Sequence, residues 1–312
     1  MGYRCDWLQD RYHSVEEWGW EDPPPAPEYL LTRDGDGILQ RGLLGLVGGD
    51  GGIGKSYALL ELAILTASGA GDRWMGAYDV HNHGPALVVF GEDSSQSLHR
   101  RLWKLTKGRD LDRGNRPWRK DLEIIAGAGR DLAIVNSARE RTDFYRDLAR
   151  IVASREWGLI VLDPLIRFAS GDMETNQEQA TLVMQAIQDL AETAPGGPPV
   201  LVGVHTSQAA NHRAHLSQSS IRGCTAIPNA ARWIAVMMED DKRNHLKYGH
   251  PVKWEVVKAN EDRKGDFLHL VRRGLRGGLL ECATKGELEA CESVNDTRKA
   301  SKDKPPKRKM PE

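Results

Sequence analysis

The chain has 312 residues, of which 40% are hydrophobic, and this predicts one sizeable α/β domain with flanking tails. Its formal charge of −1 excludes a histone-like or wholly acidic binding protein, so affinity for nucleic acid must come from local basic patches. The four cysteines form no CxxC pair, which excludes a zinc ribbon and a disulfide scaffold. Because no apolar run reaches the roughly 18 residues of a membrane span, and the charged N-terminus is unlike a secretion signal, we expect a cytoplasmic protein without a membrane partner.

The two ends of the chain differ in composition from its middle. Residues 1–29 carry three tryptophans and end in a proline run, which predicts an arm that covers either its own domain or a neighbouring subunit. Residues 30–283 are predicted to form the folded domain. Residues 298–309 hold seven basic residues against one acid, and residues 284–312 are therefore expected to form a disordered basic tail.

In the middle of the chain, apolar runs alternate with segments of helical spacing. Five runs are too apolar for a half-exposed sheet and are predicted as buried strands. The alternation predicts a mainly parallel sheet with helices on both faces. Later β-type stretches predict an antiparallel extension of this sheet on its C-terminal side. The predicted buried strands are 43–48, 86–91, 122–127, 158–164 and 199–205, the helices are 56–69, 94–105, 143–156 and 176–194, and the extension comprises 232–238, 253–260 and 267–273.

The sequence GDGGIGKS at 49–56 is a P-loop, with an apolar strand before it and an apolar helix after it. Its glycines let the backbone wrap around phosphates, to which the helix start offers partial positive charge. Lys55 is predicted to neutralise the terminal phosphates, and the Ser56 hydroxyl to ligate Mg²⁺. A merely flexible glycine turn would leave the Lys–Ser pair unexplained. The predicted ATP and Mg²⁺ site comprises Gly49, Asp50, Gly51, Gly52, Ile53, Gly54, Lys55, Ser56 and Tyr57.

The apolar run at 158–164 ends in an aspartate that is a candidate metal residue. Asp163 stands at the C-terminal edge of a predicted buried strand, where open α/β sheets bind their ligands. A carboxylate at this place can hold the metal through water. Taken alone, such a residue is more often a turn or helix-cap aspartate, but the P-loop upstream favours the metal role.

Two residues are candidates for activating water or sensing the γ-phosphate. Glu92 follows the strand 86–91 and can act as the general base for an attacking water. Asp93 beside it is interpreted as the cap of the next helix. His205 ends the strand 199–205 and can hydrogen-bond the γ-phosphate, which would couple hydrolysis to the following loop. A hydrogen-bonded structural histidine is the alternative for His205.

Basic residues in the second half of the chain are candidates for contacts with DNA or with a neighbouring subunit. The polar loop 206–223 carries Arg213 and Arg222, which suits contact with a phosphate backbone, while a solvated surface loop is the alternative. Arg232 starts a predicted strand and is a candidate arginine finger for an adjacent subunit's nucleotide. Lys258 is a second candidate of this kind, and a weak surface ion pair is the alternative for both.

A basic segment at 99–120 contains Trp103 and Trp118 among arginines and lysines. Basic residues interleaved with aromatics can bind single-stranded nucleic acid. An amphipathic helix whose leucines face the core explains the pattern equally well. The segment is therefore not assigned to the site.

The order of these features resembles that of the RecA-like motor ATPases, and within them the plasmid-encoded hexameric replicative helicases of RepA type. The resemblance covers about residues 24–280 through PPPAPEYLL, GGIGKS, FGEDSSQSLHRRL, LIVLDPLIRF, SSIRGCTAIPNAARW and VVKAN. It implies a RecA-like P-loop NTPase core, ATP bound between the subunits of a ring, and single-stranded DNA in the centre. On matching positions it implies that Lys55 and Ser56 hold phosphate and Mg²⁺, Glu92 activates water, Asp163 positions the metal, His205 senses the γ-phosphate and Arg232 acts in trans.

The resemblance implies an ATP hydrolase coupled to DNA unwinding, a homohexamer active in replication of a plasmid, phage or mobile element. No primase region is evident, so a primase or loader is expected to be a separate protein. One alternative is a RecA-like DNA-dependent ATPase of recombination or repair without processive unwinding. Another is an ATP-gated DNA-binding regulator, against which Glu92 argues because binding alone needs no general base.

Overall fold

The computed structural model describes residues 23–81, 84–111, 117–207, 216–240, 251–260 and 264–290. Most of the predicted arm and the basic run at 298–309 lie outside these described residues. Among the residues that are described, no helix is both long enough and apolar enough to cross a membrane.

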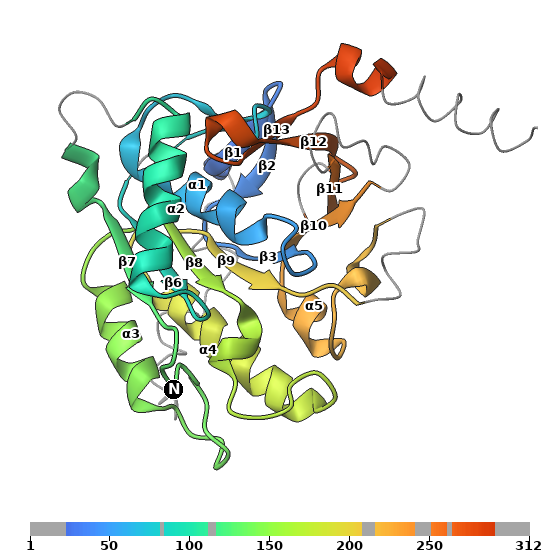
Figure 1. The fold of residues 1–312 in the computed structure, drawn as a ribbon. Coiled ribbons are helices and arrows are strands. Elements are labelled where there is room, and N and C mark those ends of the chain that lie inside the picture. The colour runs from blue at the N-terminus through green and yellow to red at the C-terminus, as the bar shows by residue number, and fades with distance from the viewer. Residues whose placement is uncertain are drawn as a thin grey trace, which may run out of the picture.

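Five parallel strands form one side of the nine-stranded main sheet, in the order β3-β9-β8-β6-β7, with β7 at its edge (Figure 1). They coincide with the five predicted buried runs, and the mainly parallel α/β prediction is confirmed. Because the strands are parallel, their C-terminal ends meet at one edge of the sheet, where ligands bind in such folds. Their bounds are β3 (Leu44–Gly48), β6 (Ala86–Phe90), β7 (Leu122–Ala126), β8 (Leu159–Asp163) and β9 (Val200–Val204).

Four further strands extend this sheet beyond β3, in the order β10-β11-β12-β13. The first of them, β10, runs parallel to β3, so the predicted antiparallel extension begins one strand later, at β11. The reason is the short helix α5, which carries the chain back across the sheet before β10, and parallel neighbours need such a crossover. The bounds are α5 (Ala226–Ala230), β10 (Trp233–Glu239), β11 (Pro251–Ala259), β12 (Phe267–Arg273) and β13 (Leu279–Cys282).

Helices cover both faces of the sheet, as the alternation of elements predicts (Figure 1). One core cluster joins α1 and α2 to strand residues such as Val88, and the other joins α3, α4 and α5 to the alternate residues such as Val89. Successive strand side chains point to opposite faces, and a strand buried on both faces is apolar throughout. The bounds are α1 (Lys55–Ser68), α2 (Ser95–Gly108), α3 (Asp143–Ala153) and α4 (Gln177–Thr193), with 3-10 turns at Pro117–Lys120, Leu165–Phe168, Gln218–Ser220 and Gly274–Arg276.

A second, four-stranded antiparallel sheet, in the order β2-β1-β5-β4, was not predicted. It is joined to the main sheet by Asp266, whose carboxylate accepts hydrogen bonds from Arg33 (2.7 Å) and Tyr78 (2.5 Å). Trp254 donates to the Tyr78 hydroxyl at 2.8 Å, and its ring packs edge-on against Trp74. The strands are β1 (Tyr29–Arg33), β2 (Asp36–Gln40), β4 (Arg73–Trp74) and β5 (Tyr78–Val80).

The chain continues in helical conformation over residues 285–290, within the segment expected to be a tail. Glu287 forms an ion pair with Arg273 of β12, and the second Glu287 oxygen accepts a hydrogen bond from the same guanidinium at 3.0 Å. The Arg273 hydrogen bonds hold the pKa of Glu287 well below its usual range, at about 2. This turn is thus attached to the main sheet.

Glu61 in α1 is expected to make the protein less stable as the pH rises. Burial raises its pKa to about 7, and the charge and hydrogen bonds of Arg109 only partly oppose this. Between about pH 4.5 and about pH 7 the folded state therefore binds more protons than the unfolded chain, and the free energy of unfolding falls as the pH rises through this window. Urea unfolding at several pH values should show that Glu61→Gln loses this slope. Equal slopes in both proteins would contradict the expectation.

Candidate active site

The P-loop connects the C-terminal end of β3 to the start of α1. Gly52 (φ 80°) and Gly54 (φ 113°) adopt left-handed backbone conformations that favour glycine. Gly54 has a second constraint, because an added Cβ would lie 2.5 Å from the Arg272 guanidinium. Added carbons at Gly51 or Gly52 would meet open space. The loop thus presents bare backbone, and α1 begins with unpaired amides that suit phosphate.

Most of the predicted P-loop residues line one cavity of about 280 Å³, together with Glu92, Asp163 and His205. Two predicted residues do not line it. Ile53 packs into the core beneath the loop, and Gly49 donates its amide to the Val204 carbonyl. The cavity also contains Asp93, Arg101, Pro164 and Arg272, none of which the sequence assigned to it.

Lys55 lies on the floor of the cavity. Its Nζ donates to the Val204 carbonyl at 3.2 Å and lies 3.9 Å from Asp163 Oδ1. Burial lowers the pKa of Lys55, while the nearby carboxylates, Asp163 foremost, oppose that shift. The ammonium is therefore poorly hydrated, and an added anion would gain a stronger interaction there than in water.

Ser56 and Asp163 meet across the sheet. The Ser56 hydroxyl donates to Asp163 Oδ2 at 2.5 Å, and the buried Oδ1 accepts no hydrogen bond from any described residue. Gly203 on the adjacent β9 leaves room for this carboxylate, because an added Cβ would lie 1.8 Å from Oδ1. A carboxylate and a hydroxyl are hard oxygen ligands of the kind Mg²⁺ prefers. The two residues thus fit the predicted Mg²⁺ site.

Glu92 and Asp93 follow β6 but differ in their surroundings. Glu92 is exposed and faces the cavity. Asp93 accepts a hydrogen bond from Arg101 Nη1 at 2.5 Å. The interpretation of Asp93 as the helix cap is wrong, because Ser94 caps α2 through its side chain. Asp93 instead holds Arg101 at the cavity.

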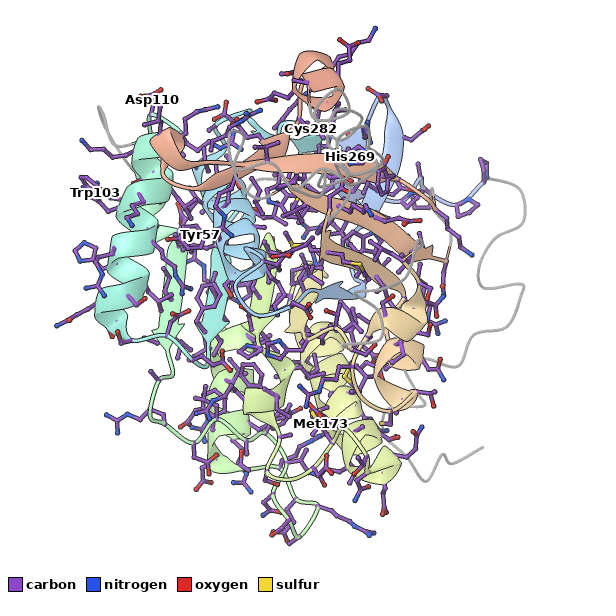
Figure 2. The ribbon with its side chains drawn as sticks, turned by 45° about the vertical axis from the view of Figure 1, so that its right-hand side comes forward. Tyr57, Trp103, Asp110, Met173, His269 and Cys282 are labelled. Atoms are coloured by element: carbon purple, nitrogen blue, oxygen red, sulfur yellow. The ribbon has the colours of Figure 1, made fainter. Side chains whose placement is uncertain are left out.

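Tyr57 is flanked by two arginines that come from distant parts of the chain. The Arg101 guanidinium of α2 lies 5.3 Å from the centre of the Tyr57 ring, and the Arg272 guanidinium of β12 lies 5.6 Å from it. Arg272 also donates to the Gly52 carbonyl at 3.3 Å. Figure 2 shows Tyr57 beside α2. With Lys55, these two arginines give the cavity three cations that can face a phosphate chain, beside the carboxylates of Asp50, Glu92, Asp93 and Asp163.

His205 lies half-buried at the end of β9 and lines the cavity. Burial lowers its pKa, and the positive charge of Lys55 lowers it further, while Glu92 opposes the shift. The imidazole is therefore neutral at pH 7 and carries one N–H donor. The residue is also joined to the loop that follows, because its carbonyl accepts a hydrogen bond from the Arg222 amide at 2.8 Å.

Of the two predicted DNA contacts, the structure describes only Arg222. Arg213 lies outside the described residues. Arg222 donates its Nε to Glu174 at 2.9 Å, so it is engaged in an exposed ion pair. Residues 216–222 are tied to β9 through a bridge between Thr206 and Ile221.

Arg232 and Lys258 lie together, away from the cavity. The Arg232 amide donates to the carbonyl of Leu44, at the start of β3, whereas the P-loop leaves the other end. The length of β3, about 13 Å, separates the two places. Lys258 of β11 pairs with Ile234 of the neighbouring β10, and the Lys258 Nζ donates to the Pro228 carbonyl at 3.0 Å. Neither cation is brought to the nucleotide cavity of its own chain.

The family described as an AAA domain matches residues 9–211, which is more than half of the chain. The chain belongs to the AAA domain family. No curated protein matches this AAA protein. Its P-loop, cavity and parallel sheet are therefore those of a P-loop ATPase.

Solved structures share the fold of this AAA protein. One solved ATPase domain has a TM-score of 0.55 at 14% identity, and the match covers 78% of this chain and 86% of that domain. A KaiC-like protein of Pyrococcus horikoshii has a TM-score of 0.54 at 14% identity, with coverages of 84% and 100%. A DnaB-like replicative helicase, studied with its interactions with primase, has a TM-score of 0.54 at 14% identity; 78% of this chain matches 58% of that helicase. The expected RecA-like fold is confirmed.

Proposed function

We propose that this AAA protein is an ATP-dependent DNA helicase of RepA type, a cytoplasmic homohexameric ring that moves along single-stranded DNA to replicate a plasmid, phage or mobile element. The observation that carries the proposal is the separation of Arg232 and Lys258 from the cavity that holds Lys55 and Glu92. Because Arg232 lies beyond reach of its own nucleotide cavity, an arginine finger at this position would have to serve the nucleotide of a neighbouring subunit. The fold that the protein shares with a DnaB-like replicative helicase supports the same conclusion.

The predicted catalytic residues divide the proposed hydrolysis among them. Lys55 and the P-loop amides hold the β- and γ-phosphates, and Ser56 and Asp163 hold Mg²⁺, which neutralises phosphate charge when bound. Glu92 takes a proton from the attacking water. Neutral His205 donates its N–H to the γ-phosphate. When hydrolysis removes this phosphate, His205 transmits the change to residues 206–223. Arg232 of the adjacent subunit offsets the charge that develops in the transition state.

Native mass measurement with and without ATP and Mg²⁺, together with unwinding of a forked duplex, tests this function. A ring that forms with nucleotide and separates the strands supports it. DNA-stimulated hydrolysis without strand separation would favour the recombination or repair ATPase. ATP-dependent assembly with negligible hydrolysis would favour the regulator. A separate primase or loader would be sought by adding the purified replication proteins of the same element.

Mixing Lys55→Ala protein with Arg232→Ala protein is expected to restore some ATPase activity. The mixed interface can pair an intact P-loop from one subunit with an intact arginine from the other, although each variant alone is inactive. Activity is measured after subunit exchange, which is followed with labelled subunits. A mixture of Lys55→Ala with Lys55→Ala is the control. Absence of rescue despite verified exchange would remove Arg232 from the site, and the same design applied to Lys258→Ala tests that residue.

Changing Arg222 and its partner Glu174 is expected to shift single-strand affinity in opposite directions. Arg222→Ala, alone or with Arg213→Ala, should weaken binding and abolish DNA stimulation of ATPase, while basal hydrolysis persists. Each lost phosphate contact should reduce the slope of the logarithm of affinity against the logarithm of salt concentration by about 0.7. Glu174→Gln releases the Arg222 guanidinium from its ion pair and should strengthen binding.

The basic run at 298–309 could supply affinity of its own, so these variants are compared in a chain that ends at Ala290. This end point keeps Glu287, which is paired with Arg273. Equal weakening by Arg222→Ala and Glu174→Gln would mean that the ion pair only shapes the loop. Unchanged salt slopes and undiminished DNA stimulation would rule out loop 206–223 as the DNA contact.

A further inference from the structure

One side of α2 carries cations and a tryptophan that the nucleotide cavity does not use. His99, Arg100, Trp103, Lys104 and Lys107 are all exposed, and they are called the α2 basic face. Their spacing of three and four residues places them along one side of the helix. Figure 2 shows Trp103 on α2, on the side away from Tyr57.

The two tryptophans of the basic segment have different environments. The Trp103 side chain is 56% exposed, whereas Trp118 is buried and belongs to the core. An amphipathic helix whose apolar side faces the core, the alternative for this segment, therefore accounts for the buried Trp118. It also accounts for the buried leucines of α2, such as Leu98 and Leu105. It does not require an aromatic residue at position 103, because polar side chains are enough for the solvated face of an amphipathic helix.

The charges on this face also differ from those of an ordinary solvated helix. No acidic residue occurs in α2, and the ion pairs among the described residues include none for Arg100 or Lys104. On α3, by contrast, the exposed Arg146 and Arg150 each pair with an aspartate three residues earlier. The α2 basic face is thus a run of positive charge, with no acid on its own helix, around one exposed aromatic ring.

We infer that the α2 basic face is a second binding surface for single-stranded DNA, separate from loop 206–223; this rests on the proposed function, in which single-stranded DNA is the track. The Trp103 ring offers a stacking platform for a base, and Arg100 and Lys104 lie next to it for the flanking phosphates. The Lys107 Nζ, 5.0 Å from the centre of the Trp103 ring, adds a cation beside the platform. An acidic protein segment would match the charges but would not use the exposed ring for stacking, as a base does.

The position of α2 connects this surface to hydrolysis. The helix begins three residues after Glu92. Its opposite side carries Arg101, which is held by Asp93 and contacts Tyr57 in the nucleotide cavity. A strand on the basic face therefore lies one helix away from the proposed general base, and its binding is expected to contribute to DNA stimulation of ATPase.

Anisotropy titrations of a labelled oligo-dT on the full chain test the inference. Trp103→Ala is expected to weaken binding about five- to a hundredfold, as loss of one stacked base does, and Trp103→Phe should retain most of the affinity. Arg100→Glu with Lys104→Glu should lower the salt slope by about 0.7 per lost contact. Basal ATPase, which these residues do not serve, reports correct folding. The matched control is Arg146→Glu with Arg150→Glu, which reverses two exposed arginines on α3.

The outcomes separate this inference from the proposed function. If wild-type protein binds oligo-dT and only loop variants such as Arg222→Ala lose affinity, the inference is overturned and the helicase proposal stands. If wild-type protein binds no single strand, both fail. Equal losses in the α2 and α3 double variants would indicate a general charge effect and would also overturn the inference.

Discussion

Lys55→Ala is expected to abolish ATP hydrolysis. The Lys55 ammonium is the buried cation of the cavity, 3.9 Å from Asp163 and hydrogen-bonded to the end of β9. Removing a preorganised charge of this kind costs about 3–4 kcal/mol of transition-state stabilisation, or about 10²–10³-fold in rate. Phosphate release measured under saturating ATP and Mg²⁺ provides the test.

Two controls accompany this variant. Lys285→Ala removes an exposed lysine, 91% of whose side chain is accessible, and should leave the rate unchanged. A thermal unfolding curve shows whether Lys55→Ala still folds, because the substitution leaves the buried Asp163 carboxylate without its cation. Wild-type turnover by the Lys55→Ala protein would remove the P-loop from the mechanism.

Glu92→Gln is expected to bind ATP and assemble but to hydrolyse slowly, by about 10²–10⁴-fold, because an amide cannot accept the proton from water. The effect should appear in kcat with little change in KM. The side chain is exposed and faces the cavity, so its replacement should not disturb the fold. Single-turnover hydrolysis and nucleotide affinity are the measurements.

Asp93→Asn is the matched comparison for Glu92→Gln. Asp93 is engaged by Arg101, whose guanidinium contacts Tyr57 beside the P-loop. Its replacement should loosen Arg101 and raise the KM for ATP more than it lowers kcat. A larger loss of kcat in Asp93→Asn than in Glu92→Gln would identify Asp93 as the general base.

The sequence by itself determined the central fold and the position of the cavity that the P-loop lines. A strand buried on both faces must be apolar throughout, so the five parallel strands are visible as continuous runs. The P-loop is recognisable because the backbone around a phosphate requires glycine, lysine and serine at fixed spacing. Asp163, Glu92 and His205 were predicted because parallel strands place their C-terminal ends at one edge. These signals are local in sequence.

Only the tertiary structure decided features that join distant segments. The small sheet was missed because its hydrogen bonds pair β1 with β5, far apart in sequence, and its strands are short. Arg101 and Arg272 reach the cavity from α2 and β12, and no local pattern distinguishes them from other surface arginines. The exposure of Trp103 and the burial of Trp118 depend on which neighbours cover each ring. The tertiary structure decides which side chains are buried, which groups pair and which strands lie side by side. Each of these is set by residues that the local sequence does not contain.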